Sequence, residues 1–597
     1  MSRVLPLFLL LATLAACTPG QVPEAPPPPG PRTSPTSTQG PLLLEEATWK
    51  LRWEIAYRNS GSKPASIRVE MPLPQDRGGW QTVRQTSLEP APDRQVTDSF
   101  GNRLAVYEWS EVPAGASVQA QVQTVVQRRG AAFCPDASQV RSPRNGPSRF
   151  LVAEPGILAD DPVILRTAAA VVGDEHNPYY RLVRLYDFVR GLDYQLTRPS
   201  QDDHESLASR VVQCSDAAGL LVSLSRAAGI PARYVAGVFL RPETPQLRIA
   251  HAWAEAWIEP YGWLPMDPTM GRFADTRTTR LGQLDPAYVV AWEGRGSRGF
   301  AVQGARDSEV SLVLHQELVS RSAPSTPSLA VPSLMGSRDL TPMLPSGRAL
   351  ELLQQAMDPG LDQQERLRAC REGLKIEPES KALMRALVVA SPSGPVRQAL
   401  DAELALRPSS SNALFGRGLL ALEDERWTQA EDFLRAAGQD FPVQHAMADL
   451  FVRTCQPGRA SQALSRATSR AVTFRLAQSA TNLFADLGDW AGLAQVAEEA
   501  ARIYPASPEF ELARAQALFR MGDQAASEAL FARMRIARPG DGLPDAVLGL
   551  LHLENGRPDR ALQLLRRALR TGLEPAERDF FADLARQVQD MPEPESP

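Results

Sequence analysis

The chain has 597 residues, of which 43% are hydrophobic and 22% charged, and its 69 acidic and 64 basic side chains give a formal net charge of −5. At about 150 residues per domain, this length predicts roughly four folding units rather than a single core. Because there is no excess of basic residues to neutralise phosphates, nucleic acid is excluded as the main ligand. The 51 prolines indicate extended linkers between folded units.

The N-terminus has the pattern of a secretion signal. Arg3 precedes a short apolar run over residues 4–14, and small residues then lead to Cys17. The run is shorter than the ~20 residues that a membrane-spanning helix needs. The last four letters, L-A-A-C, resemble the lipobox of bacterial lipoproteins. The resemblance implies a signal peptide over residues 1–16 and lipidation of Cys17; the alternative is an ordinary secretory signal with an incidental cysteine.

Residues 17–44 are predicted to be the lipidated Cys17 followed by a tether rich in Pro, Ser and Thr. The prolines at 26–29 favour polyproline II, which extends about 3.1 Å per residue and would hold the folded part away from a membrane surface. By the habit of the lipoprotein family, Thr18 after the cysteine favours the outer membrane. We therefore expect a lipid-anchored protein of the cell envelope that faces the periplasm.

Residues 45–153 have the pattern of antiparallel β-structure. Apolar and polar residues alternate at period two, and turn residues separate the runs. The runs cover residues 49–59, 65–74, 102–112 and 117–129. This pattern predicts a β-sandwich domain in which no catalytic motif falls.

Residues 155–320 mix helical and strand patterns. Residues 164–175 and 179–192 place apolar residues at helical spacing, whereas 287–293 and 309–318 are short and strand-like. We predict one α+β domain over 155–320, followed by a Pro-rich linker over 321–346.

Residues 347–590 form a helical and repetitive region. Gly488, Gly522 and Gly556 are turn glycines spaced twice by 34 residues, and the flanking helical patterns resemble the tetratricopeptide repeat. One helix pair of this kind cannot bury its apolar face alone, so the pairs stack into a superhelix with a concave groove. The resemblance implies that the groove binds a protein partner.

The cysteines beyond Cys17 are few and far apart, without a C-x-x-C pair, so neither a zinc site nor a disulfide framework is predicted. Cys370 and Cys455 lie in helical repeats and are interpreted as small buried apolar residues. Cys134 is given no partner by the sequence. No acidic loop has the spacing of calcium ligands, so we expect no metal and no cofactor.

Cys214 differs from these because of its surroundings. It stands at the start of a strongly helical segment that ends at Gly229, and Ser215 and Asp216 are residue types typical of helix starts. The positive end of a helix dipole favours a thiolate at this position. Cys214 is therefore a candidate nucleophile.

A histidine and an aspartate follow at strand positions. Residues 249–258 alternate like a strand that begins near His251, and a turn at 260–262 leads to a second strand that carries Asp267. Paired strands would place Asp267 beside His251, and the helix start would bring Cys214 against both. Cysteine as nucleophile, histidine as base and aspartate as orienting partner form the standard arrangement for thiol acyl transfer.

These residues carry a family resemblance that spans roughly residues 155–320. The blocks are Q-C-S-D-A-A at 213–218, R-A-A-G-I-P-A-R at 226–233, H-A-W-A-E at 251–255 and W-L-P-M-D-P-T at 263–269. In this order they resemble the bacterial transglutaminase-like domain. The resemblance implies a papain-like α+β core with Cys214, His251 and Asp267 as its catalytic triad.

Two further points concern the start of the helix. The family often has glycine two residues before the cysteine, where this chain has Val212. The backbone N–H of Cys214, aided by Gln213 or an aromatic residue, is the expected oxyanion stabiliser.

Other polar and aromatic residues of this region are interpreted as structural. Arg233 and Glu255 are expected to form an ion pair, and the tryptophans to form the core and the cleft walls. The five histidines outside the motif are expected to be structural: His176, His204, His315, His445 and His552.

Three functions are compatible with these patterns. The first is an envelope enzyme that attacks amide bonds through Cys214, forming a thioester that water resolves in a peptidase or amidase, or an amine in a transamidating cross-linker. The second is a catalytically idle transglutaminase-like lipoprotein that acts as a binding scaffold, and the third is a structural or assembly lipoprotein. The complete triad favours the enzyme, and the family resemblance favours hydrolysis of a protein or peptide.

Overall fold

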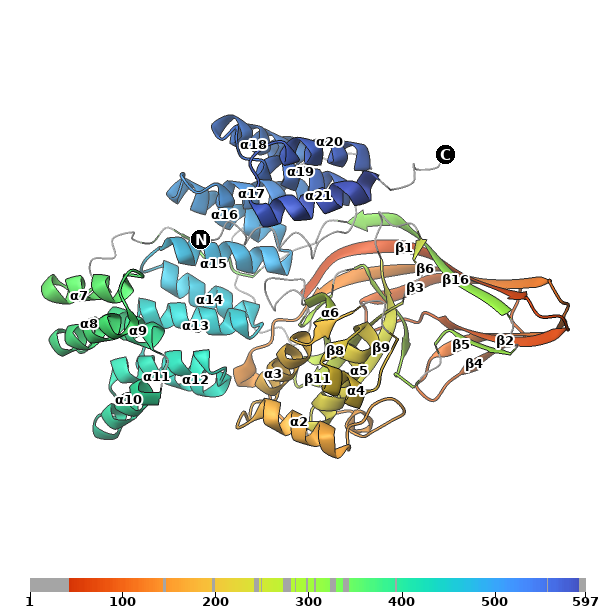
Figure 1. The fold of residues 1–597 in the computed structure, drawn as a ribbon, viewed down its shortest axis with the longest axis horizontal. Helices are drawn as coiled ribbons and strands as arrows, with labels where there is room; N and C mark the ends of the chain where they lie inside the picture. The colour runs from red at the N-terminus through yellow and green to blue at the C-terminus, as the bar shows by residue number, and fades with distance from the viewer. Residues whose placement is uncertain are drawn as a thin grey trace.

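The computed structural model describes most of the chain beyond residue 41 (Figure 1). The described ranges are 42–142, 146–195, 199–240, 246–247, 250–271, 281–284, 286–296, 299–304, 308–322, 329–334, 336, 343–391, 394–555 and 557–589. The expected signal peptide, Cys17 and nearly all of the tether therefore lie outside the described residues, as does Gly556. Among the helices that are described, none is long and apolar enough to cross a membrane.

Two β-sheets form the N-terminal unit. The first has the order β10-β16-β1-β6-β13, with β3 also paired to β6; the second has the order β15-β2-β5-β4. The strands of the first sheet are β1 (Leu42–Asn59), β3 (Gln81–Glu89), β6 (Ser117–Ala132), β10 (Gln246–Leu247), β13 (Gln283–Leu284) and β16 (Ser308–Ser322), and those of the second are β2 (Ala65–Leu73), β4 (Arg94–Thr97), β5 (Arg103–Val112) and β15 (Ala301–Gly304).

The sheets pack face to face through alternate residues, as the period of two predicts. Along β1, Trp49, Leu51 and Trp53 are buried while the residues between them are partly exposed. They share a hydrophobic core with Val69 of β2 and Tyr107 of β5. A β-sandwich is therefore present.

The sandwich includes strands from beyond residue 153. β16 pairs with β1 along nearly its whole length, from Ser308 opposite Asn59 to Ser322 opposite Glu46, and β15 pairs with β2. Residues 301–304 and 308–322 thus belong to the sheets, and not to the α+β domain or to the start of a linker as the sequence suggested. Their alternating pattern indicated strands, but a pairing across 250 residues leaves no local signal.

The α+β domain is built on a four-stranded antiparallel sheet of order β12-β11-β9-β14. Its strands are β9 (Ala232–Phe239), β11 (His251–Ile258), β12 (Gly262–Met266) and β14 (Tyr288–Glu293), with a short parallel pair, β7 (Asp193–Tyr194) and β8 (Val211–Val212). Its helices are α2 (Pro162–Val172), α3 (Pro178–Arg190), α4 (Asp203–Ser209), α5 (Cys214–Ala227) and α6 (Pro268–Gly271). Nearly every residue of α5 is buried, so α5 is the central helix.

A run of helices from α7 to α21 forms the C-terminal unit, drawn in green to blue in Figure 1. Most are 10 to 14 residues long and succeed one another in antiparallel pairs, an arrangement that resembles a tetratricopeptide superhelix. They are α7 (Gly347–Met357), α8 (Gln363–Ile376), α9 (Lys381–Ala390), α10 (Gly394–Leu406), α11 (Ser411–Glu423), α12 (Trp427–Ala437), α13 (Phe441–Arg453), α14 (Pro457–Thr468), α15 (Phe474–Leu487), α16 (Trp490–Ile503), α17 (Pro508–Arg520), α18 (Gln524–Ala537), α19 (Leu543–Glu554), α20 (Pro558–Leu569) and α21 (Pro575–Gln589).

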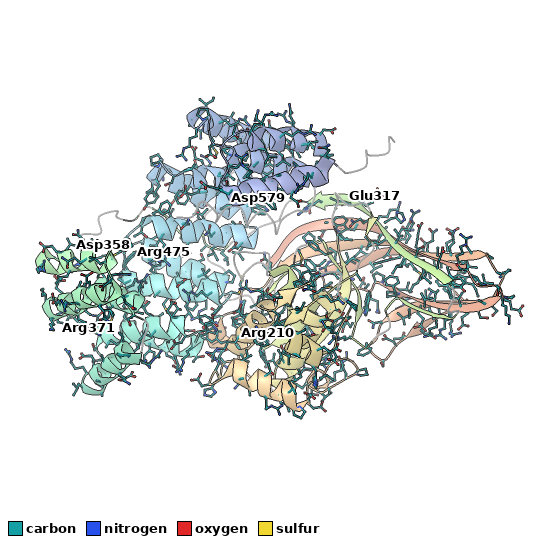
Figure 2. All side chains as sticks on the ribbon, in the orientation of Figure 1. Arg210, Glu317, Asp358, Arg371, Arg475 and Asp579 are labelled. Carbon is teal, nitrogen blue, oxygen red and sulfur yellow. The ribbon has the colours of Figure 1, made fainter. Side chains whose placement is uncertain are left out.

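One of the turn glycines of the repeats ends a helix. Gly488 caps α15 in the left-handed conformation, with φ 66°, and its N–H donates to the last turn. A residue with a Cβ is strained in that conformation, so glycine at this point sets the register of the repeat. Charged side chains such as Arg371 on α8 and Arg475 on α15 project to solvent (Figure 2).

The helical repeats pack directly on the α+β domain. The Tyr179 hydroxyl of α3 donates to the backbone carbonyls of Thr454 and Cys455 at 2.8 and 3.0 Å. The hydroxyl of Tyr180 donates to Glu431 at 2.6 Å. Helices of both units share one hydrophobic cluster, and in Figure 1 α3 lies beside α12.

Part of the predicted linker also belongs to this contact. Leu329 and Leu334 are buried in the shared cluster, and the N–H of Leu334 donates to Glu499 of α16 at 2.7 Å. Residues 329–334 are thus packed against the repeats, because their two leucines supply an apolar surface that the count of prolines did not weigh.

We predict that Tyr180→Phe destabilises the whole protein. The change removes one of the donors to the Glu431 carboxylate, which is 5% exposed and also bound by Arg459, and the loss of a buried hydrogen bond to a charged group costs about 1–3 kcal/mol. Denaturant unfolding of the full chain measures it. Tyr504→Phe removes a hydroxyl that donates to Val472 inside the repeats at 3.2 Å and is part-buried, so it serves as the control. Equal stability of both variants and the wild type would contradict the prediction.

Candidate active site

The nucleophile candidate lies at the first residue of α5. Gln213 is extended, with φ −104° and ψ −177°, and Cys214 begins the helix. The Asp216 carboxylate accepts hydrogen bonds from the backbone N–H groups of Gln213 and Gln201 at 3.3 and 2.9 Å, and from the Ser200 hydroxyl at 2.7 Å. Asp216 thus has the helix-start role that its residue type suggests, and it holds the loop before α5 in place.

Val212 is accommodated without a glycine. It lies in β8, is fully buried, and pairs in parallel with Tyr194 of β7. Because the backbone at this point is an ordinary strand, the departure from the family pattern does not disturb the path into α5.

His251 and Asp267 come from neighbouring strands, as predicted. His251 is the first residue of β11, and Asp267 directly follows β12. The His251 Nε2 atom and the Asp267 Oδ2 atom are 2.6 Å apart. The antiparallel pairing of β11 and β12 therefore brings together the two residues that the sequence placed in one site.

Asp267 is held by four further hydrogen bonds. Its Oδ2 accepts from the Tyr288 hydroxyl at 2.8 Å, and its Oδ1 accepts from the N–H groups of Thr269 and Met270 at 3.0 and 2.9 Å. Its backbone carbonyl accepts from Tyr186 of α3 at 3.1 Å. A fully buried carboxylate needs such partners to stay ionised.

The Cys214 side chain lies close enough to His251 to act on the pKa of the imidazole. Since Nε2 is engaged by Asp267, the ring nitrogen that meets the thiol is Nδ1. Cys214 is 6% exposed and the His251 side chain 12%, so this contact is largely shielded from water. The structure thus brings all three predicted residues into one site, in which His251 and Asp267 are hydrogen-bonded and Cys214 lies beside His251.

The electrostatics favour a charged histidine. Burial lowers the pKa of His251, but the charge of Asp267 and the hydrogen bonds with Asp267 and Cys214 outweigh it and raise this pKa from 6.5 to about 10. Burial also acts on Asp267, but the charge and hydrogen bond of His251 keep its pKa below the usual value. A proton taken from the thiol is therefore held on His251 at neutral pH.

Aromatic rings surround the imidazole. Ring centroids of Trp253, Tyr288 and Phe239 lie 6.0, 5.9 and 6.4 Å from that of His251. Trp253 is fully buried, which agrees with its interpretation as a core residue. These rings exclude water from the His251–Asp267 pair and so strengthen its electrostatic attraction.

The expected role of Gln213 as an oxyanion stabiliser stays a prediction. The contact that the structure gives it is the backbone hydrogen bond to Asp216, which concerns the helix start. By contrast, Tyr288 and Tyr186 touch Asp267 and were missed by the sequence analysis. Tyr288 carried a weak signal, since it lies in a predicted strand, but only the strand order brings that strand to the site.

A buried ion cluster lies at the far end of the same sheet. Glu255 of β11 pairs with Arg233 of β9 at 2.6 Å, as expected, and also with Arg77 at 3.4 Å. Arg77, from the loop that precedes β3 of the sandwich, pairs with Glu293 of β14 at 2.5 Å. The cluster therefore fastens the sandwich to the active-site sheet.

Within the described ranges, no group of three or more His, Cys, Asp or Glu side chains is arranged to hold a metal ion. The arrangement that is present can supply a nucleophile, a base and an orienting carboxylate.

A cysteine at the start of a central helix, with His and Asp on an adjoining antiparallel sheet, is an arrangement typical of papain-like folds. Residues 166–268 match the sequence model of the transglutaminase-like superfamily. The chain thus contains a transglutaminase-like domain, with further units on both sides of it.

Similarity to a curated relative is local. A protein-glutamine gamma-glutamyltransferase of Pseudomonas aeruginosa is 46% identical over 63 residues, which is 9% of this chain and 9% of that protein. The chain therefore spans only about a tenth of the length of this curated relative.

Solved structures similar to the chain fall into two groups. One, from Cytophaga hutchinsonii, was described as a candidate cysteine protease; it is 17% identical, covers 48% of this chain and 96% of its own, and has a TM-score of 0.38. A tetratricopeptide repeat protein from Parabacteroides merdae is 16% identical, covers 41% of this chain and 99% of its own, and has a TM-score of 0.25. At these scores neither adds to the assignment of the fold.

We predict that Asp267→Asn lowers the pKa of His251. Because the Asp267 charge raises this pKa to about 10, the neutral amide shifts proton release toward neutral pH. In the wild type the charged pair stabilises the fold fully below the ordinary histidine pKa of 6.5, and this stability is lost as the pH rises through about 10. NMR titration of 13C-histidine-labelled protein measures the His251 pKa in the wild type and in Asp267→Asn. The same His251 pKa in both proteins would contradict the prediction. Glu54→Gln, which removes a carboxylate beside His315, is the control and should leave the His251 pKa unchanged.

We also predict that Arg233→Met destabilises the protein by about 3 kcal/mol, because it removes one partner of a fully buried carboxylate. Glu255 would keep only the longer contact to Arg77. Arg348→Met breaks a pair whose side chains are 58% and 61% exposed, so it should cost less than about 1 kcal/mol. Denaturant unfolding compares the two; similar losses would contradict the assigned burial of the cluster.

Proposed function

We propose that this protein is a cysteine enzyme that cleaves amide bonds of a protein or peptide, with Cys214 as nucleophile, His251 as base and Asp267 as the group that orients His251. The placing of Cys214, at the start of α5, beside a His251 that is hydrogen-bonded to the buried Asp267 is the observation that carries the proposal. The local likeness to a glutamyltransferase agrees with acyl transfer through a thioester.

In the first half-reaction, the Cys214 sulfur attacks the amide carbonyl carbon while its proton resides on His251. The carbon–nitrogen bond then breaks, His251 passes the proton to the leaving amine, and a thioester with Cys214 remains. Asp267 stabilises the imidazolium form throughout. Backbone N–H groups at the start of α5 are available to the oxyanion, because the first turn of a helix leaves its N–H groups without partners inside the helix.

In the second half-reaction, water resolves the thioester. His251 takes a proton from the water, the hydroxide oxygen attacks the thioester carbon, and the carbon–sulfur bond breaks to release an acid. If a substrate amine replaces water, the product is a new amide and the protein is a cross-linking enzyme. Hydrolysis is our principal proposal, and the transferase activity named for the Pseudomonas relative makes transamidation the second candidate.

The helical repeats are proposed to recruit a protein partner or the substrate. A cavity of about 640 Å³ lies between α15, α17, α18 and α19. Aromatic walls from Phe474 and Phe510 alternate in it with polar side chains such as Asn482 and Gln516. Apolar walls with a few polar groups suit a peptide segment. Attachment to the outer membrane through lipidated Cys17 is part of the proposal.

A catalytically idle scaffold is the alternative, and thiol reactivity separates the two. Iodoacetamide added to the full chain at neutral pH should alkylate Cys214 at least ten times faster than the other cysteines. Burial raises the pKa of Cys134 to about 12 and that of Cys370 to about 11, so both stay as unreactive thiols. Peptide mass spectrometry locates the label.

Two variants complete this experiment. Cys214→Ala should abolish the rapid labelling, whereas Cys370→Ala should leave it intact. Label found only at Cys370 or Cys455 would reject the enzyme proposal. Envelope proteins from cells with Cys214→Ala and from wild-type cells then identify the reaction, since hydrolysis creates new chain ends and transamidation creates branched peptides.

A further inference from the structure

A recess of about 440 Å³ opens beside the N-terminus of α5. Its walls come from the loop at 200–203, from Ser215 and from Tyr234 and Arg295. Ser215 directly follows Cys214, so the recess adjoins the nucleophile. Nothing in the triad chemistry described above uses it.

Most polar groups of the recess are already paired. The Asp203 carboxylate bonds Arg295 at 2.6 Å and Ser223 at 2.5 Å, and the hydroxyls of Ser200 and Ser215 lie 2.9 Å apart. These contacts hold the wall residues in place before a ligand binds. The entropic cost of ordering side chains on binding is therefore small.

Tyr234 is the exception among them. It is 6% exposed, its hydroxyl has no hydrogen-bond partner in the part of the chain that the structure describes, and it lines the recess. Burial raises the pKa of Tyr234, and the nearby Cys214 raises it further, so the group stays a neutral hydroxyl close to the thiol. A ligand in the recess could form a hydrogen bond with this hydroxyl, which can both donate and accept.

The recess carries an excess of negative charge. The carboxylates of Asp202 and Asp203 line it together with one guanidinium, that of Arg295. Arg295 lies 2.6 Å from Asp203 and 3.5 Å from Asp216, which is outside the lining. Asp202 is exposed, and among the described residues its carboxylate has no cationic partner. The N-terminal ends of α4 and α5 offset part of this charge, and the exposed Asp202 keeps the mouth of the recess negative.

The strand register separates the recess from the histidine. His251 pairs with Gly237, whereas Tyr234 pairs with Ala254, three residues further along β11. Since side chains alternate along a strand, His251 and Tyr234 point to opposite faces of the sheet. His251 protonates the leaving amine, so the amine half of the substrate lies on its side. The acyl half of the substrate therefore lies on the other side of Cys214, where the recess opens.

We propose that the recess is the acyl-side specificity site and that it selects a substrate whose acyl group carries a positive charge, either an ammonium or a guanidinium. The cation pairs with Asp202 and donates a hydrogen bond to the oxygen of Tyr234. This inference rests on the proposed function, because it takes Cys214 as the nucleophile.

Two affinity labels of matched size test the inference on the full chain: tosyl-lysine chloromethyl ketone and tosyl-norleucine chloromethyl ketone. In each, the Cys214 sulfur displaces chloride from the chloromethyl carbon, so a carbon–sulfur bond forms and chloride leaves. Each rate is divided by the iodoacetamide rate of the same variant, which removes differences in thiol reactivity. The wild type should react at least tenfold faster with the lysine reagent.

The variants locate the preference. Asp202→Asn keeps a capping residue at the start of α4 and should reduce the lysine preference at least fivefold, and Tyr234→Phe should reduce it about threefold. Glu205→Gln, an exposed charge change on the same helix, should retain it. Equal rates of the two reagents in the wild type, or a preference that survives in both recess variants, would overturn the inference. A Cys214 that does not react even with iodoacetamide would overturn the proposed function itself.

Discussion

The buried carboxylate of Asp267 is the group on which the arrangement of the α+β domain depends. An unpaired charge at this depth would be strongly unfavourable, so it requires a partner for each of its lone pairs. Those partners come from β11, β14 and α6, and its backbone carbonyl is bound by α3. Satisfying one carboxylate therefore fixes the relative positions of four elements, and the position of His251 follows from them.

Helix α3 extends this constraint beyond the domain. Tyr186 in its second half bonds the Asp267 carbonyl, while Tyr179 and Tyr180 in its first turn are bonded to the helical repeats. One rigid helix of 13 residues thus contacts both the site and the repeats. The repeats are consequently part of the same packed body as the site, and not an appendage on a linker.

Patterns within short windows made most of the fold predictable. Period-two runs such as 49–59 predict the sandwich strands, helical spacing predicts the repeats, and the motif blocks predict that Cys214, His251 and Asp267 share one site. What could not be predicted depends on contacts between distant residues. The pairing of β16 with β1, the docking of Tyr180 on Glu431 and the bond from Tyr288 to Asp267 each join segments whose sequences carry no sign of one another. The burial of Leu329 and Leu334 was not predictable for a related reason. The high proline content of this segment indicates a linker, whereas the two leucines pack on distant parts of the chain.

The central position of β1 has a mechanical consequence. β1 is the first described element, and it lies between β6 and β16, antiparallel to both. Its ladder of hydrogen bonds extends on both sides along nearly all of its 18 residues. A force applied to the N-terminal residues acts along the strand axis, so it loads the two ladders in shear and distributes tension over many bonds at once. The fold thus resists traction at the end of the chain that precedes β1.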